Sequence, residues 1–229
     1  FDQLEVNPDN EDLIGHLIEQ SENPTVGILA HPGQVDVRIT AKAPSVEIAE
    51  QLIAPIEQKV KQLLEGHIFG VDKQSMEDVV GALLMTENIT VASYEDITGG
   101  LLADRLIKAD PTRFIEGTVG GGIKSILRLL EKLPKSAECL PELKYPEVLV
   151  NDLANAVRIN SGSDYGIALH GVPDKEEDVQ NLAKGQTYMC VTDGETTNTR
   201  TYNISGRGTP DRARLSLNAI ELLRSTLMG

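Results

Sequence analysis

The segment Thr90–Gly100 carries the residue types from which a catalytic or binding site could be built. Ser93, Asp96 and Thr98 stand close together there, and a hydroxyl beside a carboxylate is a pairing used in nucleophilic catalysis. The β-branched start predicts a strand, and Thr98-Gly99-Gly100 predicts a helix behind it. A helix start offers free N–H groups and a positive dipole end to a phosphate or carboxylate. A helix capped by Thr98, with glycines that let the chain turn, explains the same residues without a ligand.

A second candidate is His170, which ends a predicted strand and precedes Gly171. Ligands of open α/β sheets bind at the carboxyl ends of the strands, so His170 could face the same crevice as Asp96 and titrate near neutral pH. The alternative is a strand-end histidine bonded to the backbone. The 4 histidines are scattered and no carboxylate–histidine spacing repeats, so the sequence predicts no metal site.

Three arginines, Arg207, Arg212 and Arg214, cluster at the start of the last predicted helix of an acidic chain. Such a cluster predicts either salt bridges across the helix end or an anion clamp that acts together with the helix dipole. The residues alone leave both alternatives open.

The glycine-rich stretch 117–125 is similar to a phosphate loop, but its spacing differs. Ile123 stands between Gly122 and Lys124, which misplaces the lysine relative to a phosphate cradle. A nucleoside triphosphatase is therefore not favoured. A turn that lets a backbone or a ligand approach is the better interpretation of these glycines.

Hydrophobic periodicity places these candidates in a larger architecture. From residue 75 onward predicted helices and strands alternate, which indicates an α/β/α three-layer domain with a mixed sheet. Residues 1–71 predict a separate small α+β domain whose long helix is capped by Ser45. We therefore expect two domains, 1–71 and 72–229. The remaining expected elements are strands 25–30, 35–41, 66–70, 114–119, 165–170, 186–192 and 197–204, helices 123–133 and 148–159, a turn at 171–174, and a last helix capped by Thr209.

Composition excludes some classes of partner. The 229 residues carry a net charge of −14 with a sequence pI near 4.7, which argues against nucleic acid, because phosphate backbones need Lys and Arg density. No apolar run has the length of a membrane span. Two distant cysteines suggest no disulfide framework, so we expect a cytoplasmic protein. Phe1 in place of an initiator Met suggests an excised piece of a longer chain.

Several stretches together resemble the competence/damage-inducible CinA family along essentially the whole chain. Residues 23–44 resemble the region that follows the family's molybdopterin-binding-like domain, and residues 66–70 its usual junction. From about residue 72 the chain is similar to the family's C-terminal domain, which is a nicotinamide-nucleotide amidase. Residues 98–103 and Arg105-Leu106 fit the leading motif of that domain. The family's first domain is absent here.

The motif that carries the family's nucleophile departs from its pattern in this chain. The family reads Glu-Ser-Cys-Thr-Gly-Gly, and its serine is the amidase nucleophile. Glu95 fits, but Asp96 stands at the serine position and Ile97 at the cysteine position. The resemblance therefore implies that the expected nucleophile is missing.

Two further motifs of the family are also changed. A Ser-Tyr-Ser-Asn run followed by a lysine, whose tyrosine and lysine assist the nucleophile, is replaced by residues 120–123. Lys124 is out of step by about two residues with the family lysine in an ungapped alignment. The family's Thr-Gly-Ile-Ala-Gly-Pro turn corresponds to residues 170–173, with His170 at the threonine position.

These departures lead to one main hypothesis and one competing hypothesis. A low-pKa carboxylate at Asp96 is a poor acyl nucleophile, which favours a CinA-like protein with a degenerate amidase site that serves as a scaffold or ligand-binding module. The alternative keeps hydrolysis of nicotinamide mononucleotide or a related amide: Asp96 or His170 activates water and Lys124 stabilises the oxyanion. The enzyme hypothesis requires these three catalytic candidates to converge on one pocket.

A third hypothesis is a phosphate-binding regulatory module that uses the helix start at Thr98 with Arg207 and Arg212. By resemblance we expect a phosphate-bearing nucleotide as ligand and a homodimer, with no cofactor. The expected ligand-binding residues are Glu95, Thr98, Gly99, Gly100, Gly171, Arg207 and Arg212.

Overall fold

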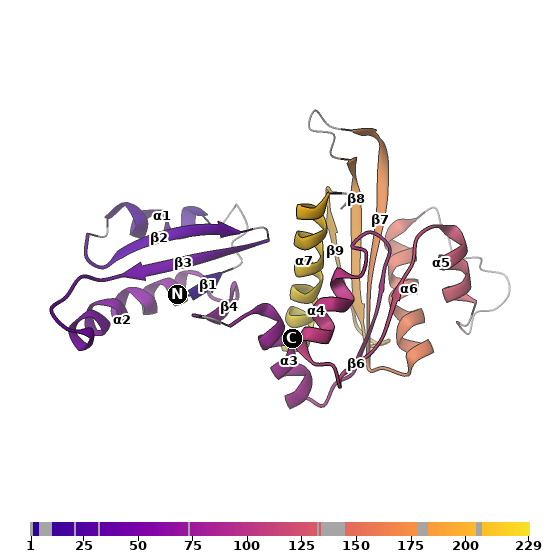
Figure 1. Cartoon of the computed structure of the whole chain (residues 1–229), viewed down its shortest axis with the longest axis horizontal. Helices are drawn as coiled ribbons and strands as arrows, with labels where there is room; N and C mark the ends of the chain where they lie inside the picture. The colour runs from indigo at the N-terminus through magenta and orange to yellow at the C-terminus, as the bar shows by residue number, and fades with distance from the viewer. Residues whose placement is uncertain are drawn as a thin grey trace. The chain divides into compact units, whose positions relative to one another are not determined.

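A computed structural model describes residues 2–4, 11–20, 22–31, 33–72, 74–131, 133, 145–177, 183–204 and 208–229. The chain divides into two compact units, 1–75 and 76–229, and each is considered by itself (Figure 1). Residues 134–144 lie outside the described part of the chain.

The first unit contains a four-stranded antiparallel sheet and two helices. The strand order is β2-β3-β1-β4. Val26 of β2 and Val37 of β3 are buried on the same face, against apolar side chains of both helices. The expected small α+β domain is confirmed, although β1 was not predicted because three residues give too short a pattern. The elements are β1 Asp2–Leu4, α1 Glu11–Gln20, β2 Thr25–His31, β3 Gln34–Thr40, α2 Val46–Leu63 and β4 Ile68–Val71.

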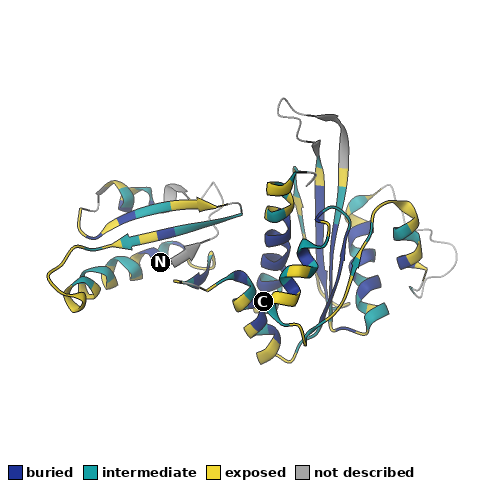
Figure 2. Ribbon diagram, in the orientation of Figure 1, coloured by how far each residue is buried: buried dark blue, intermediate teal, exposed yellow. Residues whose placement is uncertain are grey.

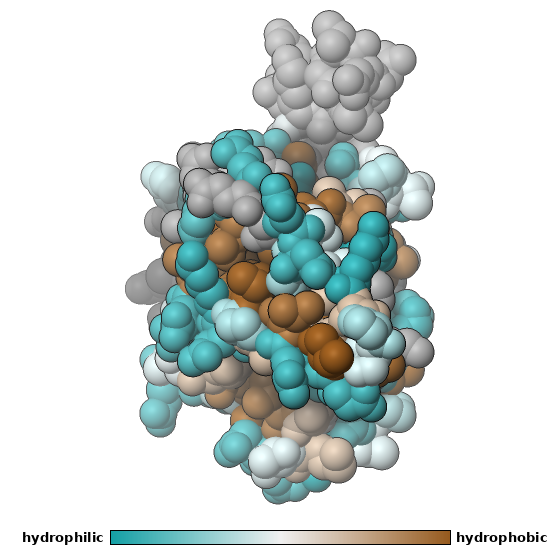
Figure 3. Space-filling model, turned by 90° about the vertical axis from the view of Figure 1, so that its left-hand side faces the viewer, coloured by the Kyte–Doolittle hydropathy of each residue, from teal (hydrophilic) through white to brown (hydrophobic). Residues whose placement is uncertain are grey.

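Ser45 begins α2 as expected, because its hydroxyl accepts a hydrogen bond from the amide of Ile48. Large apolar side chains of this unit are partly exposed at Leu29, Val46 and Ile48. Figure 3 shows hydrophobic residues between hydrophilic ones on one face of the molecule. This face is therefore mixed in hydropathy, although the chain has a net charge of −14.

The second unit is built on a five-stranded mixed sheet with the order β6-β5-β7-β8-β9. Strand β5 pairs in parallel with both β6 and β7, whereas β8 pairs antiparallel with β7 and with β9. The predicted mixed sheet is thus confirmed. The strands are β5 Val91–Glu95, β6 Phe114–Val119, β7 Tyr165–Glu177, β8 Ala183–Thr192 and β9 Thr197–Tyr202.

Helices cover both faces of this sheet, which confirms the predicted α/β/α layers (Figure 1). Ala92, Tyr94, Ala168 and Cys190 pack on one face against α5 and α6. Helices α3, α4 and α7 form the other layer, and Figure 2 shows buried residues along the strands and along α7. The helices are α3 Met76–Thr86, α4 Leu101–Ala109, α5 Ile123–Leu130, α6 Pro146–Ser161 and α7 Thr209–Met228.

Helix α7 is the most deeply enclosed of the described helices in this unit. Every residue from Leu215 to Arg224 is buried, and the helix contacts α3, α4 and the strands β7, β8 and β9. Its N-cap is Gly208 with no side-chain hydrogen bond, so the predicted cap at Thr209 is wrong by one residue.

The turn expected at 171–174 is also wrong, because β7 continues to Glu177 and stays paired with β8. Strand β5 ends at Glu95, which lies opposite Leu169, so β7 has an open edge on that side beyond this point. A proline is tolerated at an edge, where no neighbouring strand needs its missing N–H group. Pro173 therefore does not break the strand.

Candidate functional site

The carboxyl ends of the three parallel strands meet at one edge of the sheet. Glu95, the last residue of β5, lies opposite Val119 of β6 and Leu169 of β7. The residues that come next in the sequence therefore lie at this same edge. They are Asp96, Gly120 and His170. This is the edge at which open α/β sheets bind their ligands.

Asp96 and His170 form a direct pair at this edge. The Asp96 Oδ2 atom lies 2.6 Å from His170 Nδ1, and the two side chains are only 7% and 13% exposed. When Nδ1 carries the proton, the carboxylate fixes the imidazole and leaves Nε2 as an acceptor. Among the described residues Nε2 has no hydrogen-bond partner. The structure thus brings together two of the three catalytic candidates.

The second oxygen of the same carboxylate also accepts a hydrogen bond. The Gly171 amide donates to Asp96 Oδ1 over 2.9 Å. Gly171 is tightly packed, because a Cβ at this position would overlap Ile97 Cγ2. Gly171 therefore serves to hold Asp96 in this structure, and its predicted contact with a ligand stays a prediction.

Lys124, the third catalytic candidate, is exposed as the second residue of α5. Within the described ranges it makes no hydrogen bond or ion pair with Asp96 or His170. Of the three residues that the enzyme hypothesis requires to converge, Asp96 and His170 are paired, whereas no described hydrogen bond or ion pair joins Lys124 to them.

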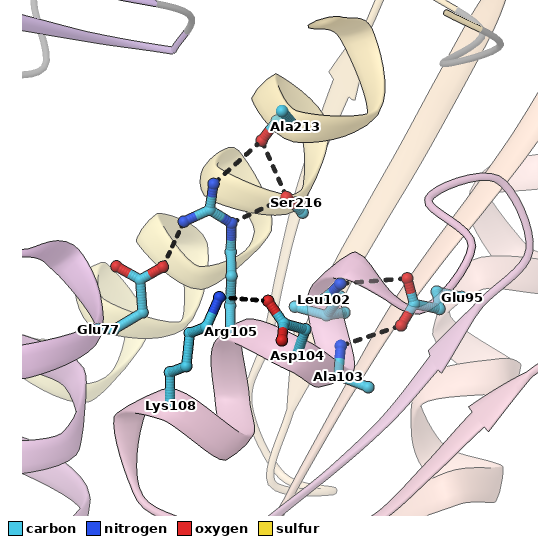
Figure 4. A network of polar contacts seen from close by, with 9 residues as sticks. All are labelled: Glu77, Glu95, Leu102, Ala103, Asp104, Arg105, Lys108, Ala213 and Ser216. Carbon is cyan, nitrogen blue, oxygen red and sulfur yellow. Dashed lines mark hydrogen bonds and ion pairs between the residues drawn. The ribbon is translucent and has the colours of Figure 1, made fainter. Parts of the chain in front are cut away.

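Glu95 is fully buried and acts on the other side of the strand, at the start of α4. Its carboxylate accepts hydrogen bonds from the Leu102 amide over 3.2 Å and from the Ala103 amide over 2.9 Å (Figure 4). It also accepts a hydrogen bond from the Thr98 hydroxyl. A buried carboxylate at a helix start is stabilised by these donors and by the helix dipole. The amides expected to bind an external anion are thus occupied in part by Glu95.

The expected helix cap at Thr98 is wrong. The N-cap of α4 is Gly100, without a side-chain hydrogen bond, and the Thr98 hydroxyl donates to Glu95 instead. The physical reason is that the Glu95 carboxylate, at the end of β5, accepts the hydrogen bonds of the first-turn amides in place of a capping side chain. The predicted roles of Glu95 and Thr98 in ligand binding stay predictions.

The glycine turn before α4 lies beside an arginine from α7. Gly99 and Gly100 have φ values of 68° and 97°, which favour glycine. A Cβ at Gly99 would lie 3.5 Å from Nη1 of Arg212. The structure therefore brings Arg212 to the predicted anion-binding turn, whereas Arg207 lies outside the described residues.

Arg105 fixes α4 between its two neighbouring helices (Figure 4). Its guanidinium forms an ion pair with Glu77 of α3, and its Nε donates to Ser216 Oγ of α7 over 2.9 Å. The Ala213 carbonyl accepts a further, longer bond of 3.5 Å. This network holds α4, and with it the turn at Gly99, in a defined position.

Sequence reasoning missed Tyr94, which precedes Asp96 by two residues on the same face of β5. Tyr94 is fully buried, and its hydroxyl has no hydrogen-bond partner in the described chain. Burial, the nearby negative charge of Asp96 and the approach of the Tyr94 hydroxyl to the Asp96 carboxylate raise the pKa of Tyr94 above its ordinary value. The phenol therefore stays protonated and can donate a hydrogen bond. The period of two along the strand is the signal that could have indicated it.

Ser125 was missed as well. It lies in the first turn of α5, and its hydroxyl occupies the space that a Cβ at Gly120 would need. The Tyr94 ring is close by, with Cε2 4.0 Å from that same point. The glycine run thus allows two hydroxyl-bearing residues to approach each other.

Among the described residues no cluster of three or more His, Cys, Asp or Glu could hold a metal ion. No described helix is long and apolar enough to cross a membrane.

Comparison with known proteins identifies the family. Residues 9–70 match the model of the damage-inducible protein CinA KH domain. A putative competence-damage inducible protein of Clostridium botulinum strain Langeland is 33% identical over 224 residues, which is 96% of this chain and 54% of the relative. The chain belongs to the CinA family. It spans about half the length of the curated relatives it matches, and a CinA-like protein of Kosmotoga olearia, 27% identical over 94% of this chain and 52% of its own length, shows the same proportion.

Solved structures of CinA proteins share the fold. The competence or damage-inducible protein from Enterobacter asburiae aligns with a TM-score of 0.54 at 20% identity, covering 68% of this chain and 99% of its own. The competence/damage inducible protein CihA from Agrobacterium tumefaciens aligns with a TM-score of 0.54 at 15% identity, covering 70% of this chain and 100% of its own. At this identity the likeness establishes the fold alone.

Proposed function

We propose that the second unit of this CinA-family chain binds a nucleotide that carries a carboxamide and a phosphate, as a nicotinamide nucleotide does, without forming an acyl-enzyme. The proposal rests on the two hydrogen bonds of the Asp96 carboxylate. One oxygen accepts from His170 and the other from the Gly171 amide. A carboxylate held in this way positions an imidazole and is not free to attack a carbonyl carbon.

The resemblance to nicotinamide-nucleotide amidases supports the ligand class, and the site supports the loss of covalent chemistry. An aspartate carboxylate is in general a weaker acyl nucleophile than an activated serine hydroxyl. Arg212 beside the Gly99 turn supplies a positive charge that suits a ligand phosphate. The unit would then act as a ligand-binding module within a longer protein.

A second candidate function is hydrolysis by an activated water molecule. The Asp96–His170 pair favours it, because a carboxylate on Nδ1 orients the imidazole and leaves Nε2 as the proton acceptor. In that case His170 Nε2 would take a proton from water as the water attacks the carboxamide carbon. The imidazole would then return that proton to the amide nitrogen, so that the C–N bond breaks and ammonia and the carboxylic acid are released. Lys124 makes no contact with this pair, so the oxyanion would need another donor.

The test titrates nicotinamide mononucleotide into the purified chain by calorimetry and measures ammonia release in parallel. The variants are His170→Ala, which removes the imidazole, and the matched control His67→Ala at an exposed position of the first unit. Saturable binding without ammonia, weakened by His170→Ala and not by His67→Ala, supports the binding module. Ammonia release that disappears in His170→Ala supports the hydrolase instead. Absence of saturable binding would overturn both candidates.

A further inference from the structure

Strand β6 forms one edge of the sheet of the second unit, and part of its backbone faces away from the sheet. Among the described strands, β6 pairs only with β5. The Gly120 amide donates to the Glu95 carbonyl over 3.0 Å, so the backbone of Gly120 is directed toward β5. Because successive residues of a strand direct their backbone groups to opposite sides, Thr118 also faces β5, whereas Gly117 and Val119 face outward.

The side chains along this edge are exposed and largely apolar. Ile115 is 48% exposed and Val119 is 54% exposed. Gly117, between them, lies on the α4 side of the sheet, because a Cβ there would stand 3.2 Å from Ala103 Cβ. Ile107, one turn further along α4 on the same side of the helix as Ala103, is 51% exposed. The edge strand and the neighbouring helix therefore present apolar side chains together.

The sequence of β6 lacks most of the features by which proteins protect an edge strand from pairing. Proline and lysine are both absent from Phe114–Val119, and the one charged side chain is that of Glu116. Outward N–H and C=O groups beside exposed apolar side chains form a surface to which another strand can be added. This edge is therefore suited to pairing with a strand of another molecule.

The strand is complementary to a second copy of itself, run antiparallel about a two-fold axis. Outward residues must lie opposite outward residues, and a register centred on Gly117 places Gly117 opposite Gly117 and Val119 opposite Ile115. The same register places Glu116 opposite Thr118, whose hydroxyl can donate to the carboxylate. A register centred on Glu116 would instead bring two like charges face to face.

We propose that β6 pairs with β6 of a second copy of this chain in the register centred on Gly117, so that the two five-stranded sheets join into one continuous sheet. Apolar side chains of Ile115 and Val119 are then buried across the two-fold axis. Because each copy carries a net charge of −14, the copies repel each other at low salt, and added salt strengthens the dimer. The pairing does not depend on the ligand of the proposed function.

Sedimentation velocity of the purified chain over a range of protein concentrations tests the association. We expect a dimer whose dissociation constant falls when NaCl is added. Val119→Lys should raise that constant by about tenfold or more, because a charge on an edge strand opposes pairing. Met85→Lys adds the same charge at a 63% exposed position of α3 and should leave the constant unchanged. A wild-type chain that stays monomeric, or a dimer on which the two variants act equally, overturns the proposal.

Disulfide cross-linking tests the register and leaves the apolar side chains in place. Glu116→Cys and Thr118→Cys are made separately in a Cys139→Ser background, in which the remaining Cys190 is fully buried. In the proposed register the two positions form a non-hydrogen-bonded pair with Cα atoms about 4.5 Å apart, which suits a disulfide. We expect a cross-linked dimer when the two variants are mixed and oxidised, and far less from either alone. Equal cross-linking of Glu116→Cys by itself, or none in the mixture, overturns the register.

Discussion

Glu95 and Asp96 are adjacent in the sequence, yet their carboxylates accept hydrogen bonds from different layers of the fold. Glu95 binds the first-turn amides of α4, whereas Asp96 binds His170 and the Gly171 amide of β7. The alternation of side chains along a strand produces this separation. One acidic pair therefore fixes the end of β5 both to the helix that follows it and to the neighbouring strand.

Replacing Glu95 by Gln should destabilise the second unit strongly. The amide offers a single acceptor oxygen to three donors and turns its own N–H groups toward them, so we expect a loss on the order of 3 kcal/mol in the free energy of unfolding. Urea unfolding measures it. Asp104→Asn, which removes only an exposed pair with Lys108, should change stability by about 0.5 kcal/mol or less. Equal effects of the two variants would contradict the capping role.

Gly171→Ala should cost about 2 kcal/mol because the new methyl group overlaps Ile97. Adding Ile97→Ala should recover part of that loss, since it removes the overlapping atoms, and a double-mutant cycle measures the coupling. Gly121→Ala serves as control, because nothing lies within 4 Å of its Cβ. Additive effects of Gly171→Ala and Ile97→Ala would show that the two sites do not press on each other.

Arg105→Lys should lower the free energy of unfolding by about 1–2 kcal/mol. Lysine keeps the charge but cannot bond Glu77 and Ser216 at once with the geometry of a guanidinium. Arg214→Lys on the exposed start of α7 is the matched control and should be nearly neutral. Chemical denaturation followed by circular dichroism would compare them, and a neutral Arg105→Lys would mean that the network does not hold α4.

Asp164 should make stability depend on pH. The Thr90 hydroxyl and then the Thr90 amide lower the pKa of Asp164 below its ordinary value. A lowered pKa stabilises the fold above the unfolded value and loses that contribution as the pH falls through the folded value. Asp164→Asn should therefore cost on the order of 1 kcal/mol at pH 7, discounted for exposure, and almost nothing well below pH of about 3.9. The exposed Glu116→Gln should show no comparable change.

Cys190 should be unreactive in the folded protein. The side chain is fully buried in β8, and burial raises the pKa of its thiol to about 12, so almost no thiolate forms at pH 8. In a Cys139→Ser background, which leaves a single thiol, iodoacetamide should modify the protein only after denaturant is added. The reaction is monitored by mass spectrometry. Rapid modification of the native protein would show that the α6 side of the sheet opens and exposes the Cys190 thiol to solvent.

The layered fold could be predicted from the sequence because its signals are local. The expected strands 25–30 and 186–192 and the α2 cap at Ser45 depend on short-range periodicity and on a single side chain, and they agree with the structure. The cap at Thr98 could not be predicted correctly, since Glu95 reaches the helix start through the turn. The continuation of β7 past Pro173 depends on its pairing with β8, which is a contact distant in sequence.

The candidate site could also be predicted in part from local sequence signals. Asp96 and His170 each follow a predicted strand, and parallel strands bring their carboxyl ends together, so sequence reasoning could place both at one edge. Tyr94 and Ser125 depend on which face of the sheet each residue takes and on the missing Cβ at Gly120. The way the helices pack on the sheet determines both of these features, and the sequence pattern does not show that packing.

The enclosed helix α7 has a consequence for synthesis on the ribosome. Because its buried stretch Leu215–Arg224 packs against α3 and α4, these earlier helices stay uncovered until α7 has left the exit tunnel. Their apolar faces stay exposed to chaperones during translation. The second unit should therefore complete its core after synthesis of its last helix, rather than strand by strand as the chain emerges.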